Sequence, residues 1–275
     1  NWHAKYLFRV IGENIEGKRK DTIINVAPGS AKTELFSIHF PIYSMIKIKK
    51  VRNLSLSFSD SLVKRNSKRV RDLIKSKEFQ SLWPCSFGTC RDDEIQVLDE
   101  NGKVRFESIS KAMAGQVTGS RGGYMTDDYS GCIMLDDPLK PDDALSNVRR
   151  ESVNMLLKNT IRSRRASSVK GHETPIIAVQ QRLHVLDTSN FMESGGMGIK
   201  FDVVKVPALV TEDYADTLPD WIKQQFIDDV LSSEYIERDG VKYYSYFPAK
   251  ESVHDLMAMK DADPYTFLSQ YLQEP

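Results

Sequence analysis

Short apolar runs, separated by segments of helical periodicity, recur along the chain. Polar residues, glycine or proline bound each run, which is typical of buried strands in a parallel sheet. The strands predicted in this way are Thr22–Val26, Val51–Phe58, Cys132–Leu135, Thr174–Val179 and Lys200–Pro207. The predicted helices are Asn1–Gly12, Glu34–Met45, Ser61–Ser76, Ala144–Arg162, Trp221–Phe226 and Pro264–Leu272. This alternation predicts an α/β fold with a mostly parallel central sheet flanked by helices.

Three segments depart from this alternation. Phe79–Phe87 is predicted to be a loop, and Glu94–Phe106 a hairpin that turns at residues 99–102. Residues 112–131 form a glycine-rich segment, and five of the chain's 15 glycines lie between Gly115 and Gly131. So glycine-rich a loop in a compact domain is more often functional than a plain connection.

Charge divides the chain into two parts. Residues 201–275 hold 15 acidic and 6 basic side chains, although the whole chain has a net charge of zero. This change predicts a core at residues 1–207 and a small acidic lid or linker subdomain at residues 208–275. Residues 47–77 hold 11 basic and 2 acidic side chains, so Lys64, Lys68 and Arg71 are candidates for contacts with nucleic-acid phosphates. A solvated helix face is the alternative.

Two compositional features bear on where the chain works. No apolar run approaches the roughly 20 residues that a membrane span requires. The three cysteines are sparse and odd in number, which is typical of a reducing compartment.

The strand Thr22–Val26 leads into a loop of small residues that ends in Lys32 and Thr33. A strand, such a loop and a following helix form a P-loop, whose backbone N–H groups cradle phosphates. Lys32 would reach the β- and γ-phosphate oxygens, and the Thr33 hydroxyl would bind Mg²⁺. Val26 and Ala31 stand where the usual pattern has glycine, so an ordinary strand–turn–helix corner is the alternative. The predicted nucleotide-binding residues here are Ala27, Pro28, Gly29, Ser30, Ala31, Lys32, Thr33 and Glu34.

Two carboxylates, Asp136 and Asp137, directly follow the predicted strand Cys132–Leu135. Parallel sheets bind ligands at the carboxyl ends of their strands, where the P-loop also lies. Asp136 would hold Mg²⁺, and Asp137 would orient and polarise the attacking water. An acidic turn after a core strand is the alternative. Together the two motifs predict a P-loop nucleoside triphosphatase of the ASCE type that uses ATP and Mg²⁺.

Further nucleotide contacts are predicted at both ends of this core. Trp2 lies about one helix and one turn before the P-loop strand and could stack on adenine, or it could simply belong to the hydrophobic core. Gln180 and Gln181 end the strand Thr174–Val179 and would face the γ-phosphate.

Arg121 lies in the glycine-rich segment and is the predicted arginine finger. An arginine supplied by a neighbouring subunit can accelerate phosphoryl transfer by roughly 10³–10⁵. Pairing with Asp127 or Asp128 in the same loop is the alternative, and the rival fingers are Arg162, Arg164 and Arg182.

The ordered set of motifs resembles the ATPase half of the large terminase subunit of tailed bacteriophages, the motor that packs DNA into procapsids. The resemblance covers nearly the whole chain. It rests on Asn1–His3, Val26–Glu34, Phe58–Leu62, Ser67–Ile74, Gly119–Gly123, Leu135–Lys140 with Asp143 and Ala144, and Gln270–Gln273. One departure is Gln181–His184, where the family often has Thr-Arg-Trp-His. A helicase-like or other nucleic-acid-stimulated ATPase is the alternative function, and a nucleotide-binding module without hydrolysis is another.

The resemblance also implies partners and a location. It implies double-stranded DNA, a portal protein and a small terminase subunit as partners, and a homo-oligomeric ring, expected to be a pentamer, on the procapsid. The expected location is the host cell cytoplasm, without a membrane and outside the mature virion. Family members carry a nuclease domain after the ATPase half, and the chain stops where that domain would begin, so no DNA cleavage is expected from these 275 residues.

Overall fold

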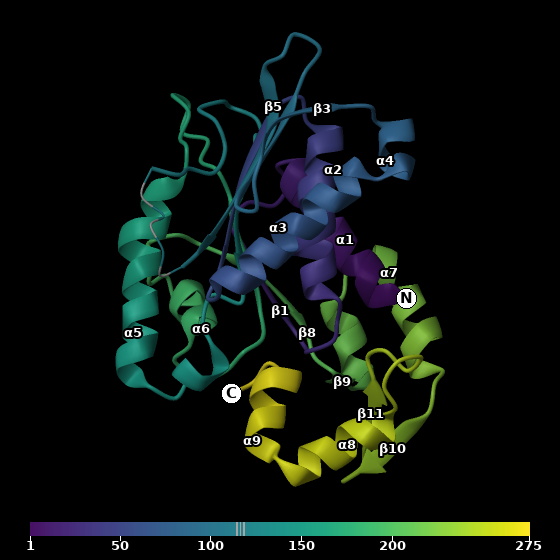
Figure 1. Cartoon of the computed structure of the whole chain (residues 1–275). Helices are drawn as coiled ribbons and strands as arrows, with labels where there is room; N and C mark the ends of the chain where they lie inside the picture. Colours follow the sequence, from purple (N-terminus) through teal and green to yellow (C-terminus); the bar gives the residue numbers. More distant parts are fainter. Residues whose placement is uncertain (114, 116, 118) are drawn as a thin grey trace.

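The computed structural model describes residues 1–113, 115, 117 and 119–275. At its centre lies an eight-stranded sheet with the strand order β3-β4-β5-β2-β6-β7-β1-β8 (Figure 1). Its strands are β1 (Thr22–Val26), β2 (Val51–Ser57), β3 (Ser86–Cys90), β4 (Glu94–Leu98), β5 (Val104–Ala112), β6 (Ile133–Asp136), β7 (Ile176–Gln180) and β8 (Asp202–Val206). All neighbours from β5 to β8 are parallel, and only β4 runs against the others. The predicted mostly parallel α/β sheet is therefore confirmed.

Strand order places the two predicted motifs at one edge of this sheet. Strand β7 lies between β1 and β6, and its Val179 is level with Ile24 of β1 and with Asp136 of β6. The chain segments that leave β1 and β6 therefore start at nearly the same height, one strand apart. This arrangement is the fold of P-loop NTPases of the ASCE type.

Helices cover both faces of the sheet. They are α1 (Trp2–Ile15), α2 (Phe40–Lys47), α3 (Asp60–Lys75), α4 (Lys77–Leu82), α5 (Asn147–Leu156), α6 (Thr188–Glu193), α7 (Asp220–Phe226), α8 (Val253–Ala262) and α9 (Pro264–Thr266). Short 3-10 and π-helical segments extend or join them: η1 (Glu34–His39), η2 (Pro141–Asp143), η3 (Leu157–Ile161), η4 (Arg162–Arg164), η5 (Glu212–Thr217), η6 (Ile227–Leu231) and η7 (Phe267–Tyr271).

The apolar runs of the strands reflect burial on both faces. In β7, Ile177 and Val179 face the hydrophobic cluster that contains α1, whereas Ile176 and Ala178 face the cluster that contains η3. Because successive side chains of a strand point to opposite faces, a strand buried on both sides needs a nearly continuous apolar sequence.

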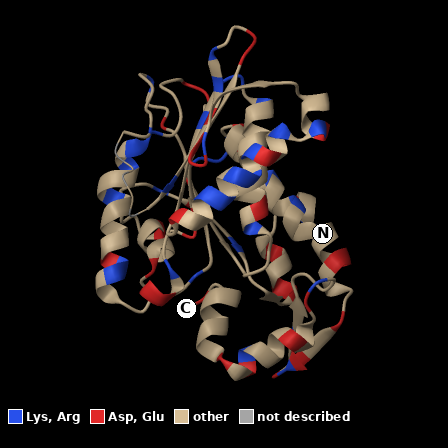
Figure 2. Cartoon of the chain, in the orientation of Figure 1, with Lys and Arg blue, Asp and Glu red and all other residues tan. Residues whose placement is uncertain are grey.

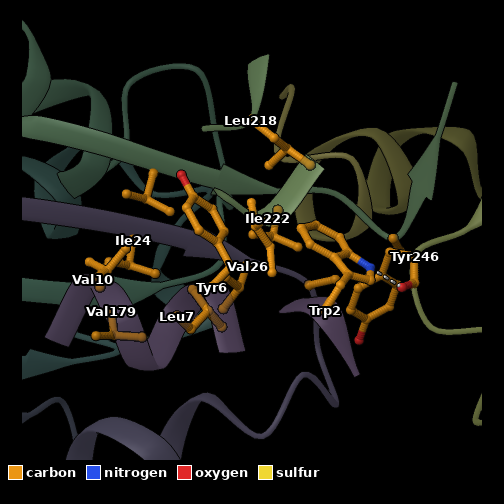
Figure 3. Close-up of a cluster of buried hydrophobic side chains, with 14 of the residues drawn as sticks. Trp2, Tyr6, Leu7, Val10, Ile24, Val26, Val179, Leu218, Ile222 and Tyr246 are labelled. Carbon is orange, nitrogen blue, oxygen red and sulfur yellow. Dashed lines mark hydrogen bonds between the residues drawn. The ribbon is translucent and has the colours of Figure 1, made fainter. Parts of the chain in front are cut away.

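Residues 208–275 pack onto the α1 side of the sheet. They form η5, α7, η6, a small antiparallel sheet of β9 (Leu209–Val210), β10 (Tyr235–Arg238) and β11 (Val241–Ser245), and the helices α8 and α9. Figure 2 shows acidic side chains spread over this part of the chain. One hydrophobic cluster joins it to α1 and to the central sheet (Figure 3). The subdomain boundary at residues 207 and 208 stays a prediction, and the core is continuous across it.

Most predicted elements are confirmed, and the short ones were missed. The predicted loop Phe79–Phe87 contains most of α4 and the start of β3, which continues to Cys90. The Ser76 side chain caps α4 by accepting a hydrogen bond from Phe79 N, but six residues are too few to show a helical period. Helices α6 and α8 were not predicted either. Within the part of the chain that the structure describes, no helix has the length and apolar character needed to cross a bilayer.

Candidate functional site

The loop between β1 and η1 has the backbone conformation of a P-loop. Gly29 has a φ of +76° and Ala31 a φ of +62°. Both values lie in the left-handed region that favours glycine, and alanine adopts it at a cost of about 1 kcal/mol. Ala31 stands where the P-loop pattern has glycine. The prediction that only Gly29 supplies such a conformation is therefore wrong, because Ala31 accepts the strained backbone.

Lys32 and Asp137 meet although 105 residues separate them. The Lys32 ammonium donates a hydrogen bond of 2.7 Å to Asp137 Oδ1, and both side chains are largely covered. Asp137 itself has a φ of +46°, which ends β6 and which aspartate tolerates better than most residues. The cation predicted for phosphate and the acid predicted for water are thus neighbours in the unliganded chain.

Asp136 lies behind this pair in a more enclosed place. Its Oδ2 accepts a hydrogen bond of 2.6 Å from Ser37 Oγ and a longer one of 3.4 Å from Asn66 Nδ2. Burial and the neighbouring Asp137 charge raise its pKa to about 6, although Ser37, Lys32 and Thr33 act in the opposite direction. The buried carboxylate is therefore held at a free-energy cost, which a bound cation would relieve.

Two orphaned oxygen atoms fit a magnesium ion at this corner. Asp136 Oδ1 and Ser30 Oγ are buried and have no hydrogen-bond partner within the described residues. Thr33 lies close enough to Asp136 to lower the pKa of that carboxyl, so a hydroxyl and a carboxylate oxygen are available together. Mg²⁺ takes oxygen ligands, and it commonly binds through one or two protein groups plus substrate phosphates. The described residues contain no cluster of three or more metal-ligating side chains, so the phosphates would complete the shell.

The two glutamines at the end of β7 lie differently. Gln180 is buried, and its Oε1 accepts a hydrogen bond of 2.7 Å from Thr188 Oγ1. Its Nε2 has no partner within the described part of the chain. Gln181 is half-buried. Because β7 lies between β1 and β6, an unsatisfied donor at its end stands beside the predicted phosphate site.

Trp2 is part of the core, which corrects its predicted role in stacking on adenine. Its side chain is only 1% exposed and packs edge-on against Phe226 and Tyr214. Its Nε1 donates a hydrogen bond of 2.8 Å to the Tyr246 carbonyl (Figure 3). The ring therefore has no free face for a base, and it joins the start of the chain to the C-terminal part.

Arg121 lies at the opposite edge of the sheet from the P-loop. The next residue, Gly122, receives the N–H of Ala166 and bridges Arg165, and Gly123 N donates to the Arg52 carbonyl near the start of β2. Arg121 therefore has no place in the phosphate site of its own chain. Its side chain is exposed and has no ion pair within the described residues. Asp127 pairs instead with Lys170, so the alternative pairing in the loop is not observed for that residue.

Close packing accounts for glycines in the same segment. A Cβ on Gly123 would lie 2.0 Å from Thr174 Oγ1, and one on Gly131 would lie 1.9 Å from the Arg52 carbonyl. Ala114, Gln116 and Thr118 of the glycine-rich segment lie outside the described residues. Of the rival fingers, Arg182 follows β7 but is held by Asp187 at 2.9 Å, and Arg162 and Arg164 form η4.

Three residues of the site were missed in the sequence. Ser37 and Asn66 position Asp136, and Lys250 donates a hydrogen bond of 2.9 Å to the Gly29 carbonyl. Ser37 follows the P-loop by one helical turn, which is a local signal that could have identified it. Asn66 and Lys250 come from α3 and from the C-terminal part, and no sequence spacing connects them to the loop.

The raised pKa of Asp136 makes stability depend on pH. Between the ordinary pKa of 3.8 and about 6, the folded chain retains a proton that the unfolded chain has lost, so stability falls as pH rises through this window. We expect unliganded Asp136→Asn to exceed the wild type in unfolding free energy at pH 7.5 by up to about 3 kcal/mol, with the difference closing near pH 4. Urea denaturation at both pH values measures this, with exposed Asp128→Asn as the control. An Asp136→Asn variant less stable than the wild type at pH 7.5 would contradict it.

Comparisons with known proteins were made by sequence and by structure. No protein-family model and no curated protein matches the chain. Among solved structures, the chain is similar to a mutant of the large terminase ATPase domain of Thermus phage P74-26, with a TM-score of 0.48 and 10% identity over 93% of this chain and 89% of that one. It is also similar to the large terminase of a thermophilic bacteriophage, with a TM-score of 0.40 and 12% identity over 77% of this chain and 44% of that one.

A third structure holds the large terminase of a thermophilic bacteriophage in complex with ATP-gamma-S. Its TM-score is 0.37 at 10% identity, over 77% of this chain and 44% of that one. The chain thus spans less than half the length of these two full-length terminases.

Proposed function

We propose that the chain is the ATPase motor domain of a large terminase subunit, which hydrolyses ATP to move double-stranded viral DNA into a procapsid. The observation that carries the ATPase part is the corner formed by Lys32, Thr33, Asp136 and Asp137 at the level carboxyl ends of β1 and β6. The motif resemblance in the sequence supports the assignment to terminases.

The residues of this corner divide the chemistry among them. The P-loop backbone and Lys32 bind and orient the phosphates, and Thr33 with Asp136 would hold the metal ion. Magnesium held there would neutralise charge on the phosphate oxygens during transfer. Asp137 would accept a hydrogen bond from the attacking water and place it in line with the γ-phosphate.

The ion pair between Lys32 and Asp137 must open before this chemistry occurs. In the unliganded chain each group neutralises the other at 2.7 Å. Phosphate oxygens would attract the ammonium away and leave Asp137 free to act on water. The pair therefore keeps the acid occupied until a nucleotide arrives.

Helix α3 is the proposed DNA-binding element. Figure 2 shows basic side chains along it. Lys64 pairs with Asp60 and Arg71 with Asp92, so these predicted phosphate contacts are already neutralised in part. Arg65 and Lys68 are exposed, lie one turn apart and have no ion pair within the described residues. They are the better candidates on the same helix.

We expect the double variant Arg65→Ser with Lys68→Ser to bind duplex DNA more weakly, equally for all sequences, because phosphate contacts release counterions without reading bases. The slope of log affinity against log salt should fall in magnitude by about 2. Fluorescence anisotropy at several salt concentrations measures both. The matched control is Lys64→Ser with Arg71→Ser, which removes charges that already have partners. An unchanged slope in the first variant would return α3 to a solvated face.

One experiment tests the proposed function as a whole: the rate of ATP hydrolysis against protein concentration, with and without duplex DNA. A terminase motor should hydrolyse ATP faster as concentration rises and as duplex DNA is added. Strand separation coupled to hydrolysis would favour a helicase-like ATPase instead. Tight ATP binding without phosphate release at any concentration would identify a binding module and overturn the proposal.

Arg121 keeps a role only as a finger supplied to a neighbouring subunit. Its exposed position away from the home site is compatible with such a role in a homo-oligomeric ring, and the pentamer, portal protein, small subunit and host cytoplasm remain proposals of the same kind. Mixing Arg121→Ala with Asp137→Asn subunits and measuring hydrolysis would test it, because some interfaces then pair an intact site with an intact arginine.

A further inference from the structure

The C-terminal part of the chain reaches the P-loop through Lys250. Its ammonium donates a hydrogen bond of 2.9 Å to the Gly29 carbonyl, across 221 residues of sequence. Gly29 makes this approach possible because a Cβ at that position would lie 2.1 Å from the Lys250 Nζ. A cation from the acidic part of the chain therefore rests on the loop predicted to hold phosphates.

Packing fixes the segment that carries this lysine. Tyr246 is fully buried, its N–H donates to the Ala208 carbonyl, and its carbonyl accepts the hydrogen bond from Trp2 (Figure 3). Phe247 packs against His3 with ring centroids 5.0 Å apart, and Lys250 N donates to the Phe247 carbonyl in a turn. The backbone of Lys250 is thus held beside the P-loop by the core, and only its side chain is free to move.

The hydrogen bonds of Lys250 leave capacity for an anion. An ammonium has three donors, and the single hydrogen bond found for this one uses one of them. Within the described residues Lys250 has no carboxylate partner, whereas Lys205, Lys223 and Lys242 in the same part of the chain all have one. The charge of Lys250 is close enough to contribute, after burial and the N-terminal amine, to lowering the pKa of His3 to about 4. His3 therefore stays neutral and does not compete for a phosphate.

We propose that Lys250 is a second phosphate-binding cation, which contacts the di- or triphosphate of a bound nucleotide and so ties residues 208–275 to the P-loop. The inference rests on the proposed ATP-binding function and names a further residue of that site. Lys32 lies three positions after Gly29 in the loop, so the two ammonium groups would approach the phosphates from different parts of the chain. Trp2 contributes indirectly, because it braces the segment that carries Lys250.

The test compares Lys250→Met, which keeps the aliphatic stem and removes the charge, with the wild type. The matched control is Lys260→Met, a lysine of α8 that lies over the Tyr243 ring away from the loop. Calorimetric titration with Mg·ATP and Mg·ADP should show about a tenfold or greater loss of affinity in Lys250→Met, since a hydrogen bond to a charged group is removed. The control should bind as the wild type does, and Lys250→Arg should recover part of the affinity.

A second measurement separates phosphate binding from a structural role. Hydrogen exchange of residues 241–252 should slow on ATP addition in the wild type and not in Lys250→Met, while the melting temperatures without nucleotide stay equal. Wild-type affinity and wild-type protection in Lys250→Met would overturn this inference and leave the proposed ATPase intact. A melting temperature that falls without nucleotide, with no change in nucleotide affinity, would make Lys250 a structural residue. Absence of ATP binding by the wild type would overturn both proposals.

Discussion

Asp137→Asn should bind Mg·ATP with nearly wild-type affinity and lose hydrolysis by about 10²–10⁴-fold. The amide keeps an oxygen that can accept the hydrogen bond from Lys32, but it cannot polarise water as a carboxylate does. Asparagine also adopts positive φ readily, so the backbone at +46° is preserved, whereas alanine would strain it.

The measurement is single-turnover hydrolysis together with nucleotide titration. Asp128→Asn is the matched control, because Asp128 is an exposed acid in the loop before β6 at the other edge of the sheet. Turnover within a factor of three of the wild type would remove Asp137 from the proposed catalytic role. Loss of ATP binding along with turnover would show that Asp137 contributes to the binding site and not to the water.

Lys32→Ala should lose both nucleotide affinity and turnover. The ammonium is the only group of the P-loop segment 27–34 that carries a positive charge, and it would contact oxygens whose charge grows in the transition state. We expect ATP affinity to fall by about 10–100-fold and turnover by about 10³-fold or more. The variant also leaves Asp137 without its partner beside Asp136, which raises repulsion between two carboxylates.

Lys20→Ala is the control, because Lys20 precedes β1 and is exposed at the opposite end of that strand. Nucleotide titration and steady-state hydrolysis measure the two effects separately. A Lys32→Ala variant that retains wild-type hydrolysis would contradict the P-loop assignment. If hydrolysis falls and ATP affinity does not, Lys32 acts in the transition state alone.

Local patterns predicted the strands of the parallel sheet because each strand is buried on both faces. Thr22–Val26 and Ile176–Gln180 read as apolar runs for this reason, and the loop after the first run has small residues that the turn requires. Asp136 and Asp137 were found because two charges directly after a buried strand are unusual. The short helices α4 and α6 were missed since six residues hardly exceed one and a half turns.

Trp2 and Arg121 show where local patterns stop being informative. An aromatic residue at the start of a helix looks the same in a core and beside a base, and only the partners Phe226 and Tyr246 assign it to the core. A glycine-rich loop before an acidic strand looks mobile and functional. Here Gly123 and Gly131 fit where a Cβ would collide with Thr174 and β2, and the loop lies at the amino ends of the strands.

The sequence by itself determined the order of strands and helices, the P-loop segment and the acidic pair, because these depend on neighbours within about ten residues. Only the tertiary structure decided that Lys32 meets Asp137, that Asn66 and Ser37 support Asp136, and that Lys250 reaches Gly29. The physical reason is that strand order and the packing of distant helices set these contacts. The insertion of β7 between β1 and β6 brings two motifs level that the chain separates by about a hundred residues, and no local spacing encodes that insertion.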